Sequence, residues 1–255
     1  MRIKITIAPL GEKEITLPRH YNYLVQGFIY KNLKKQIATK VHDEGFTYEK
    51  RGFRLFTFSR LFGTFVNSGE SIIFKNNCVL YLASPVTKIL ESFASSLARK
   101  GKIRIGEKYL QVTSIEVLFN REYSPPIYIR TLSPITVYST LITKEGRKKT
   151  YYYTPFEEEF GIQIKNNLLK KHAVINSRQN IAELDFIITP HRVSKNNEHI
   201  VFYKDTVVKA WSGIYKLSGS KELIQIAFDC GIGAKNSQGF GMIEVWEKEI
   251  SPVIV

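Results

Sequence analysis

The stretch Gly231-Ile-Gly-Ala-Lys-Asn-Ser-Gln-Gly239-Phe-Gly241 is the most informative part of this sequence. Two Gly-apolar-Gly triplets flank a polar insert whose side chains carry hydrogen-bond donors: Lys235, Asn236, Ser237 and Gln238. Glycine tolerates positive φ and lets another molecule approach the main chain closely. The pattern therefore fits a surface that holds an anion or a phosphodiester. It fits the flexible turn of an ordinary hairpin equally well.

The loop does not match the common nucleotide-binding loops. Its glycine spacing differs from both G-x-x-x-x-G-K-[ST] and G-x-G-x-x-G, and no helix of adequate length is expected after it. Residues 223–228 and 242–246, on either side, are rich in apolar side chains, which indicates strands. We therefore expect the loop to join the two closing strands of the chain.

Composition indicates a folded protein with a polyanionic partner. The 255 residues suit one large or two ordinary domains, and 44% apolar and 13% aromatic residues are enough for a core. The net charge is +14, and residues 1–125 carry 20 basic against 10 acidic side chains. This excess favours a nucleic acid, and after it an anionic membrane surface. A charge that serves solubility alone remains the other explanation.

Cysteine usage and hydropathy indicate a soluble, cytoplasmic protein. Cys78 and Cys230 each stand alone in an apolar run, without a C-x-x-C pair or a nearby histidine, so we expect buried thiols rather than zinc or a disulfide. The N-terminal residues alternate like a strand and lack a signal-peptide core. No segment approaches the roughly 18 apolar residues of a membrane span, and we expect no membrane partner.

The first half predicts a ferredoxin-like unit. Ile3, Ile5 and Ile7 alternate with polar residues as in a half-buried strand. Apolar residues recur every fourth position in residues 18–39, which predicts a helix. The further segments are strands 54–59, 71–74 and 78–83, a helix over 85–100, and strands 102–105 and 109–119. Strand, helix, two strands, helix and strand is the ferredoxin-like order.

The second half repeats this order less clearly. Residues 120–126 contain two prolines and predict a boundary. The segments beyond it are β-like residues 127–143 with a break at Pro134, a basic turn at 144–149, a helix over 155–171, and strands 182–189, 199–203 and 207–217. We predict an α+β fold of two tandem ferredoxin-like (RRM-like) domains, 1–122 and 127–255, with a cleft between facing sheets.

The chain shows no metal-site pattern, but one histidine is suited to RNA chemistry. The five histidines lack metal-ligand spacing. His42 lies in a segment, residues 31–60, with eight basic and three acidic side chains. An imidazole has a reference pKa near ~6.5 and exchanges protons at neutral pH. Beside RNA it can serve attack of a ribose 2′-OH on phosphorus without a metal. A lone histidine in a loop is also a common incidental feature.

The glycine-rich loop, the double ferredoxin-like order and the basic charge together resemble the Cas-six (Cas6) family of CRISPR-associated repeat-processing endoribonucleases. That family belongs to the superfamily of repeat-associated proteins, marked by a G-h-G-x-x-x-x-x-G-h-G loop in which h is apolar. Residues 231–241 fit this pattern at every position. Residues 23–30, 55–59 and 131–136 are similar to family segments too, so the resemblance covers nearly the whole chain.

The resemblance implies a cofactor-free, metal-independent enzyme that cuts CRISPR repeat RNA and leaves 2′,3′-cyclic phosphate and 5′-OH ends. It places the family's catalytic tyrosine and histidine at Tyr30 and His42. The expected lysine is replaced by Arg54, with Lys50 close enough to substitute. Residues implied to contact RNA are Lys34, Arg51, Gly231, Gly233, Lys235, Asn236, Ser237, Gln238, Gly239 and Gly241.

Two questions stay open in the sequence. Tyrosine, with a reference pKa near ~10, suits the acid and leaves His42 as the base, but neighbouring cations can reverse these roles. The second question is activity itself. Some relatives keep the fold and loop as non-catalytic RNA-binding subunits of CRISPR effector complexes, and a protein that binds anionic membranes is a third alternative. The oligomeric state is undetermined, a homodimer included.

Overall fold

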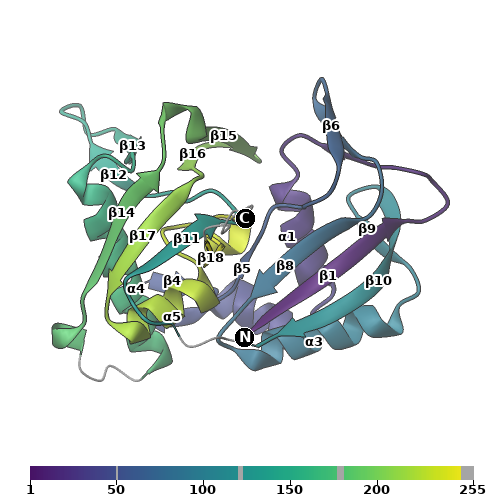
Figure 1. The fold of residues 1–255 in the computed structure, drawn as a ribbon, viewed down its shortest axis with the longest axis horizontal. Helices are drawn as coiled ribbons and strands as arrows, with labels where there is room; N and C mark the ends of the chain where they lie inside the picture. The colour runs from purple at the N-terminus through teal and green to yellow at the C-terminus, as the bar shows by residue number, and fades with distance from the viewer. Residues whose placement is uncertain (50, 120–122, 177–180, 248–255) are drawn as a thin grey trace, which may run out of the picture.

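The computed structural model describes residues 1–49, 51–119, 123–176 and 181–247. These residues form two α+β domains that lie side by side (Figure 1). Each domain has one large antiparallel sheet with helices on one face. No helix among the described residues is long and apolar enough to cross a membrane.

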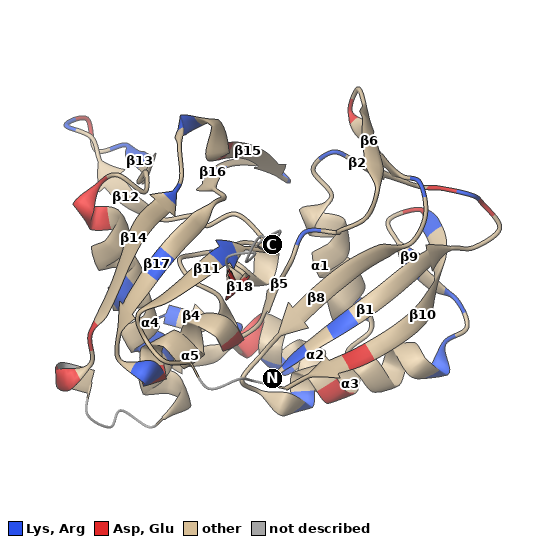
Figure 2. Cartoon of the chain, in the orientation of Figure 1, with Lys and Arg blue, Asp and Glu red and all other residues tan. Residues whose placement is uncertain are grey.

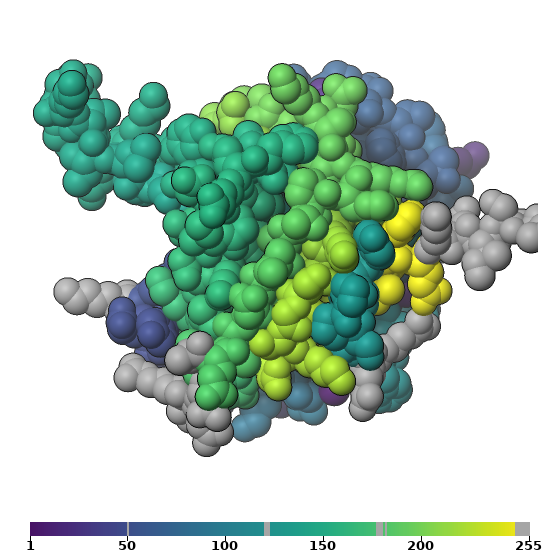
Figure 3. Space-filling model, turned by 60° about the vertical axis from the view of Figure 1, so that its left-hand side comes forward, coloured from purple at the N-terminus to yellow at the C-terminus, as the bar shows by residue number. Residues whose placement is uncertain are grey.

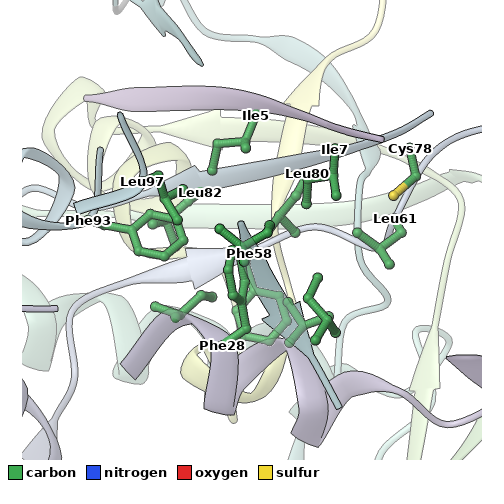
Figure 4. Close-up of a cluster of buried hydrophobic side chains, with 14 of the residues drawn as sticks. Ile5, Ile7, Phe28, Phe58, Leu61, Cys78, Leu80, Leu82, Phe93 and Leu97 are labelled. Carbon is green, nitrogen blue, oxygen red and sulfur yellow. The ribbon is translucent and has the colours of Figure 1, made fainter. Parts of the chain in front are cut away.

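The first domain is built on a sheet of order β5-β8-β1-β10-β9. Two helices, α1 (Asn22–Lys31) and α3 (Thr87–Arg99), cover one face of it. Ile5 and Ile7 of β1 are fully buried toward these helices, where Phe28 and Phe93 meet with ring centroids 5.4 Å apart (Figure 4). The strands are β1 (Arg2–Pro9), β5 (Thr57–Phe58), β8 (Cys78–Ala83), β9 (Ile103–Ile105) and β10 (Lys108–Leu118).

The helix predicted over residues 18–39 is interrupted. It comprises α1, then α2 (Lys35–Thr39), which continues into a π-helical turn, η1 (Lys40–Glu44). The buried Asn32 side chain donates a 2.9 Å hydrogen bond to the Phe28 carbonyl, and Lys34 is extended with ψ 139°. Asparagine competes for backbone hydrogen bonds in this way and favours helix ends.

Short strands surround this interruption. Pro18 ends a strand rather than opening the helix. One small sheet consists of β2 (Ile15–Pro18), β7 (Ser71–Phe74) and β6 (Phe65–Ser68), and another pairs β3 (Phe46–Tyr48) with β4 (Arg51–Phe53). The single strand predicted over residues 54–59 is wrong, because Leu55 has a φ of 48° and separates β4 from β5.

The second domain repeats the topology of the first. Its sheet has the order β14-β17-β11-β18, and α4 (Glu158–Ile175) and α5 (Lys221–Cys230) lie on one face. The strands are β11 (Ile127–Thr131), β14 (Phe186–Arg192), β17 (Ile214–Gly219) and β18 (Ile243–Val245). Strand, helix, two strands, helix, strand occurs in both halves, which confirms the tandem ferredoxin-like prediction. The predicted boundary includes residues 120–122, which lie outside the described residues.

Two hairpins and three short helical turns complete this domain. One hairpin, β12 (Tyr138–Ile142) with β13 (Lys148–Tyr152), projects from the body of the protein (Figure 3). The other pairs β15 (Glu198–Tyr203) with β16 (Thr206–Trp211). The turns are η2 (Ile181–Glu183), η3 (Lys195–Asn197) and η4 (Asn236–Gln238).

The strand predicted over residues 223–228 is wrong, because these residues lie in α5. Leu223 and Ala227, four residues apart, are fully buried, and so is Ile224 between them. The polar residues Lys221, Gln225 and Asp229 recur every fourth position of α5. Residues 223–228 include only one of them, so this short apolar window resembles a buried strand. The glycine-rich loop therefore joins a helix to β18 and is not the turn of a hairpin.

The two domains share a segment. Phe53 and Leu55 precede the first domain's strand β5, yet they pack in the core of the second domain with Phe160 and Ile164 of α4. The backbone N–H of Arg60 also donates to the Leu132 carbonyl at 2.9 Å. Residues 46–55 thus bind the second domain to the first. Both cysteines are buried free thiols, as predicted.

Candidate active site

Tyr30 and His42 lie together at the end of α1. Their rings meet edge to face, with centroids 5.1 Å apart and an interplanar angle of 87°. Tyr30 also meets Phe56 at 5.7 Å. The tyrosine follows the buried Ile29 in the last turn of the helix, so its ring stands at the rim of the core. The two residues that the sequence singled out are brought into contact across twelve positions of chain.

His42 is exposed and has a defined partner. Its Nδ1 lies 2.6 Å from Oδ1 of Asp43, and both side chains are more than half exposed. An ionised carboxylate only accepts hydrogen bonds, so Nδ1 is the donor in this contact, and in the neutral imidazole Nε2 carries the lone pair. The π-helical turn that presents His42 is a rare conformation, frequent at functional sites.

Arg54 connects the histidine to the tyrosine. Its Nη2 donates to the His42 carbonyl at 2.7 Å and its Nη1 donates to the Gly52 carbonyl at 3.3 Å. Its positive charge also acts on the Tyr30 hydroxyl and lowers the pKa of that group, against the larger effect of burial. A Cβ at Gly52 would lie 3.1 Å from Nη1, so glycine leaves the space that the guanidinium occupies. Arg54 is therefore engaged with the protein and holds the pair in place.

Burial decides the protonation state of Tyr30. Desolvation raises the pKa of its hydroxyl to about 12, although the nearby Arg54 acts in the opposite direction. The tyrosine is protonated at neutral pH and is a proton donor. The protonated tyrosine thus lies against the imidazole of His42.

The glycine-rich loop packs against α1 of the first domain. Asn22 donates to the carbonyls of Gln238 and Gly239 at 3.0 and 3.2 Å, and Gln26 donates to the Ser237 carbonyl at 2.7 Å. The four glycines are mostly or fully enclosed, and a Cβ at Gly241 would lie 1.9 Å from the Ile232 carbonyl oxygen. These glycines serve close packing of the loop within the protein.

The loop and the Tyr30–His42 pair line one cavity of about 680 Å³. Five basic side chains face a single acid, Asp205, along its wall: Arg51, Arg54, Lys171, Lys204 and Lys235. Lys235 lies over the Tyr138 ring at 5.3 Å. A cavity of this charge suits a phosphodiester. Lys and Arg also occur on the outer strands and loops of both domains (Figure 2).

The predicted site residues are not all at this cavity. Those that line it are Tyr30, His42, Arg51, Arg54, Gly233, Lys235, Asn236, Ser237 and Gln238. Lys34 is exposed and does not line the cavity. Gly231, Gly239 and Gly241 of the loop are buried and do not line it either. Lys50 lies outside the described residues. RNA contact by any of them stays a prediction. No group of metal-ligating side chains occurs in the described ranges.

The cavity contains residues that the sequence patterns missed. Gln26 and Tyr203 are hydrogen-bonded to each other on its wall. Gln26 lies one turn before Tyr30 on the same side of α1, which was a usable signal. Lys171 follows Ile164 and Leu168 in helical spacing, on the buried side of α4. A lysine in an apolar row was a second signal.

A second groove of about 1190 Å³ separates the domains elsewhere. Arg19 and Arg60 line it together with the exposed rings of Phe62 and Phe202. His20 meets Phe202 edge to face at 5.0 Å, across the domain boundary. Two acids, Glu70 and Glu198, line the groove as well. The exposed rings, rather than an excess of positive charge, are therefore the feature that suits unpaired nucleotides.

Tandem ferredoxin-like domains closed by a glycine-rich loop are the features by which this chain resembles the repeat-associated CRISPR proteins. A sequence profile described as CRISPR-associated protein Cas6, N-terminal, matches residues 16–116, and one described as CRISPR associated protein Cas6, C-terminal, matches residues 119–245. The chain belongs to the Cas6 family.

Relatives of this chain extend over nearly its whole length. A CRISPR-associated endoribonuclease Cas6 of Methanocaldococcus jannaschii is 28% identical over 95% of this chain and 92% of its own. A CRISPR-associated endoribonuclease-like Cas6 protein of Pyrococcus furiosus is 26% identical over 98% of this chain and 100% of its own. The solved structure of a CRISPR associated protein Cas6 superposes with a TM-score of 0.79, at 26% identity over 97% and 99% of the two chains.

Proposed function

We propose that this protein is a metal-independent endoribonuclease that cleaves CRISPR repeat transcripts by attack of a ribose 2′-OH on the adjacent phosphorus. The observation that carries the proposal is the contact between Tyr30 and His42, whose ring centroids lie 5.1 Å apart in a cationic cavity. Its relatives named as CRISPR-associated endoribonucleases support the substrate class.

In the proposed reaction His42 is the base and Tyr30 the acid. Nε2 of His42 removes the 2′-OH proton, because Asp43 occupies the opposite ring nitrogen. The 2′ oxygen forms a bond to phosphorus, and the bond between phosphorus and O5′ breaks. The Tyr30 hydroxyl, with a pKa of about 12, gives its proton to the departing oxygen. The products are a 2′,3′-cyclic phosphate and a 5′-OH.

Other side chains around the cavity stabilise the negative charge that develops during the reaction. The phosphorane carries more negative charge than the phosphodiester, and preorganised cations stabilise it. Arg51, Lys204 and Lys235 face the cavity and supply that charge, while Arg54 holds the catalytic pair. The second groove provides a surface on which an unpaired part of the same RNA binds.

The mechanism is tested with repeat RNA in EDTA. We expect cleavage at one position, and none when that nucleotide carries a 2′-deoxy sugar, because the nucleophile is then missing. Cleavage that requires added metal, or that persists on the deoxy substrate, rules out this mechanism.

The second candidate function is a non-catalytic RNA-binding subunit. It is favoured by the similarity to the endoribonuclease-like Cas6 protein and by Arg54, which stands where the family's lysine is expected. The variant His42→Ala separates the two functions. Lost cleavage with RNA binding retained supports the enzyme, whereas absence of cleavage by the parent protein supports the binder.

A further inference from the structure

One buried cation of the cavity pairs with no acid among the described residues. Lys171 of α4 is only 3% exposed, and its Nζ donates to the Gly231 carbonyl at 2.7 Å and to Oδ1 of Asn236 at 2.8 Å. Both acceptors are uncharged. Within the described part of the chain, no carboxylate lies within ion-pair distance of this ammonium.

Keeping such a group costs free energy. Lysine is seldom fully buried unless it is paired with an acid. Burial lowers the pKa of Lys171 to about 8; Arg51 acts in the same direction, and Cys230 opposes it. A methionine of similar shape would fill this site without the charge. Packing alone therefore does not explain why this buried position is a lysine.

Its contacts indicate that reason. Asn236, which accepts from Lys171, donates through Nδ2 to the carbonyls of Ile232 and Phe240 at 2.9 and 3.0 Å. Ile232 and Phe240 are the apolar residues of the two Gly-apolar-Gly triplets. One lysine on α4 thus holds both ends of the glycine-rich loop through a single asparagine.

The opposite side of the loop is held by α1. Gln26 and Asn22 bind the carbonyls of residues 237–239, and Tyr30 lies one turn beyond Gln26 on the same helix. Lys235, in the middle of the loop, lines the cavity that contains Tyr30 and His42. Displacement of the loop from α4 would move Lys235 relative to the proposed reacting groups.

We propose that Lys171 is a positioning residue of the RNA-cleaving site: through Asn236 it fixes the glycine-rich loop where Lys235 lines the same cavity as the Tyr30–His42 pair. This inference rests on the proposed endoribonuclease function. It assigns Lys171 no contact with the reacting atoms.

The test is single-turnover cleavage of repeat RNA by Lys171→Met, at saturating protein. We expect the rate constant to fall by one to two orders of magnitude, about the effect of an ~1 Å misplacement. The affinity for the uncleavable 2′-deoxy RNA should change much less, because the RNA-facing cations remain. Lys170→Met is the matched control, since Lys170 precedes Lys171 on α4 and, among described residues, bonds to no loop residue. It should cleave at the parent rate.

A double-mutant cycle with Asn236→Ala tests whether Lys171 acts through Asn236. If both residues act through their shared hydrogen bond, the double variant should cleave about as slowly as the slower single variant. Additive losses, or a Lys171→Met variant as fast as the parent, overturn the inference and leave the proposed enzyme intact. If the parent protein does not cleave, both proposals fall. If Lys171→Met does not fold, Asn236→Ala alone carries the test, and parental speed there refutes the positioning role.

Discussion

Nη2 of Arg54 donates a 2.7 Å hydrogen bond to the carbonyl oxygen of His42. The same guanidinium acts on the Tyr30 hydroxyl and lowers its pKa, against the larger effect of burial. Arg54 thus supports the histidine through the main chain and places a positive charge near the tyrosine.

Arg54→Ala should therefore impair the rate of cleavage more than it impairs RNA binding. Loss of the support for both residues misplaces them, and a loss of about tenfold to a hundredfold in the single-turnover rate constant is expected. Arg99→Ala is the control for charge, because Arg99 lies on α3 and, among the described residues, its guanidinium bonds to the Ser95 carbonyl of the same helix. If Arg54→Ala and Arg99→Ala lower the rate constant equally, the effect of Arg54→Ala is due to lost charge and not to misplaced residues.

Tyr30→Phe tests the assignment of the acid. The ring contacts with His42 and Phe56 are kept, so only the proton is lost, and the rate should fall by about 10²–10⁴. Tyr23→Phe, at an exposed position of α1, is the control.

A leaving-group substitution sharpens this test. A bridging sulfur at the 5′ position leaves without protonation, so RNA that carries it should restore the rate of Tyr30→Phe and not that of His42→Ala. The opposite result would exchange the two roles. Since Tyr30 has a pKa of about 12, its proton should be available and the rate should not fall between pH 8 and 10.

Local patterns predicted the elements that are buried on one face. The alternation of Ile3, Ile5 and Ile7 and the apolar row of α3 follow directly from a sheet covered by helices. Helix α5 was missed because residues 223–228 contain only one of its polar residues, Gln225, and an apolar window this short does not separate a helix from a strand. The contact of Arg54 with the His42 carbonyl had no local signal, since a backbone acceptor twelve residues away leaves no trace in side-chain spacing.

Leu55 offers a test of the strained segment beside Arg54. Its φ of 48° is left-handed, a conformation that costs a residue with a Cβ about 1–2 kcal/mol. Leu55→Gly and Leu55→Ala both lose a buried side chain, but only glycine relieves the strain. We expect Leu55→Gly to be the more stable of the two by about 1 kcal/mol in urea unfolding.

The control for this comparison is Leu80, a strand residue. There Leu80→Ala should be more stable than Leu80→Gly, by about 0.5–1 kcal/mol. The same order at both positions would contradict the assignment of strain at Leu55.

Gly241→Ala should disrupt the loop, with the free energy of unfolding lowered by more than about 2 kcal/mol. The residue has a φ of 73°, and a Cβ there would lie 1.9 Å from the Ile232 carbonyl oxygen. Gly146→Ala is the matched control, because Gly146 has a φ of 75° and nothing within 4 Å. Its free energy of unfolding should fall only by the conformational cost of alanine at positive φ, about 1 kcal/mol. Equal losses would show that the loop tolerates the added atom.

Lys171 predicts a pH dependence of stability. Its pKa in the folded protein is about 8, below the ordinary value of 10.5. The unfolded chain therefore binds more protons between these values, and the contribution of Lys171 to the free energy of unfolding rises with pH across that window, by at most about 1.4 kcal/mol per pH unit. Of the two groups that act on it, Arg51 stays charged and Cys230, with a pKa raised to about 12 by burial, stays neutral. Urea unfolding of the parent and of Lys171→Met at pH 7 to 10 measures the difference. The parent should gain stability relative to the variant as the pH rises, and parallel curves would mean that the buried lysine keeps an ordinary pKa.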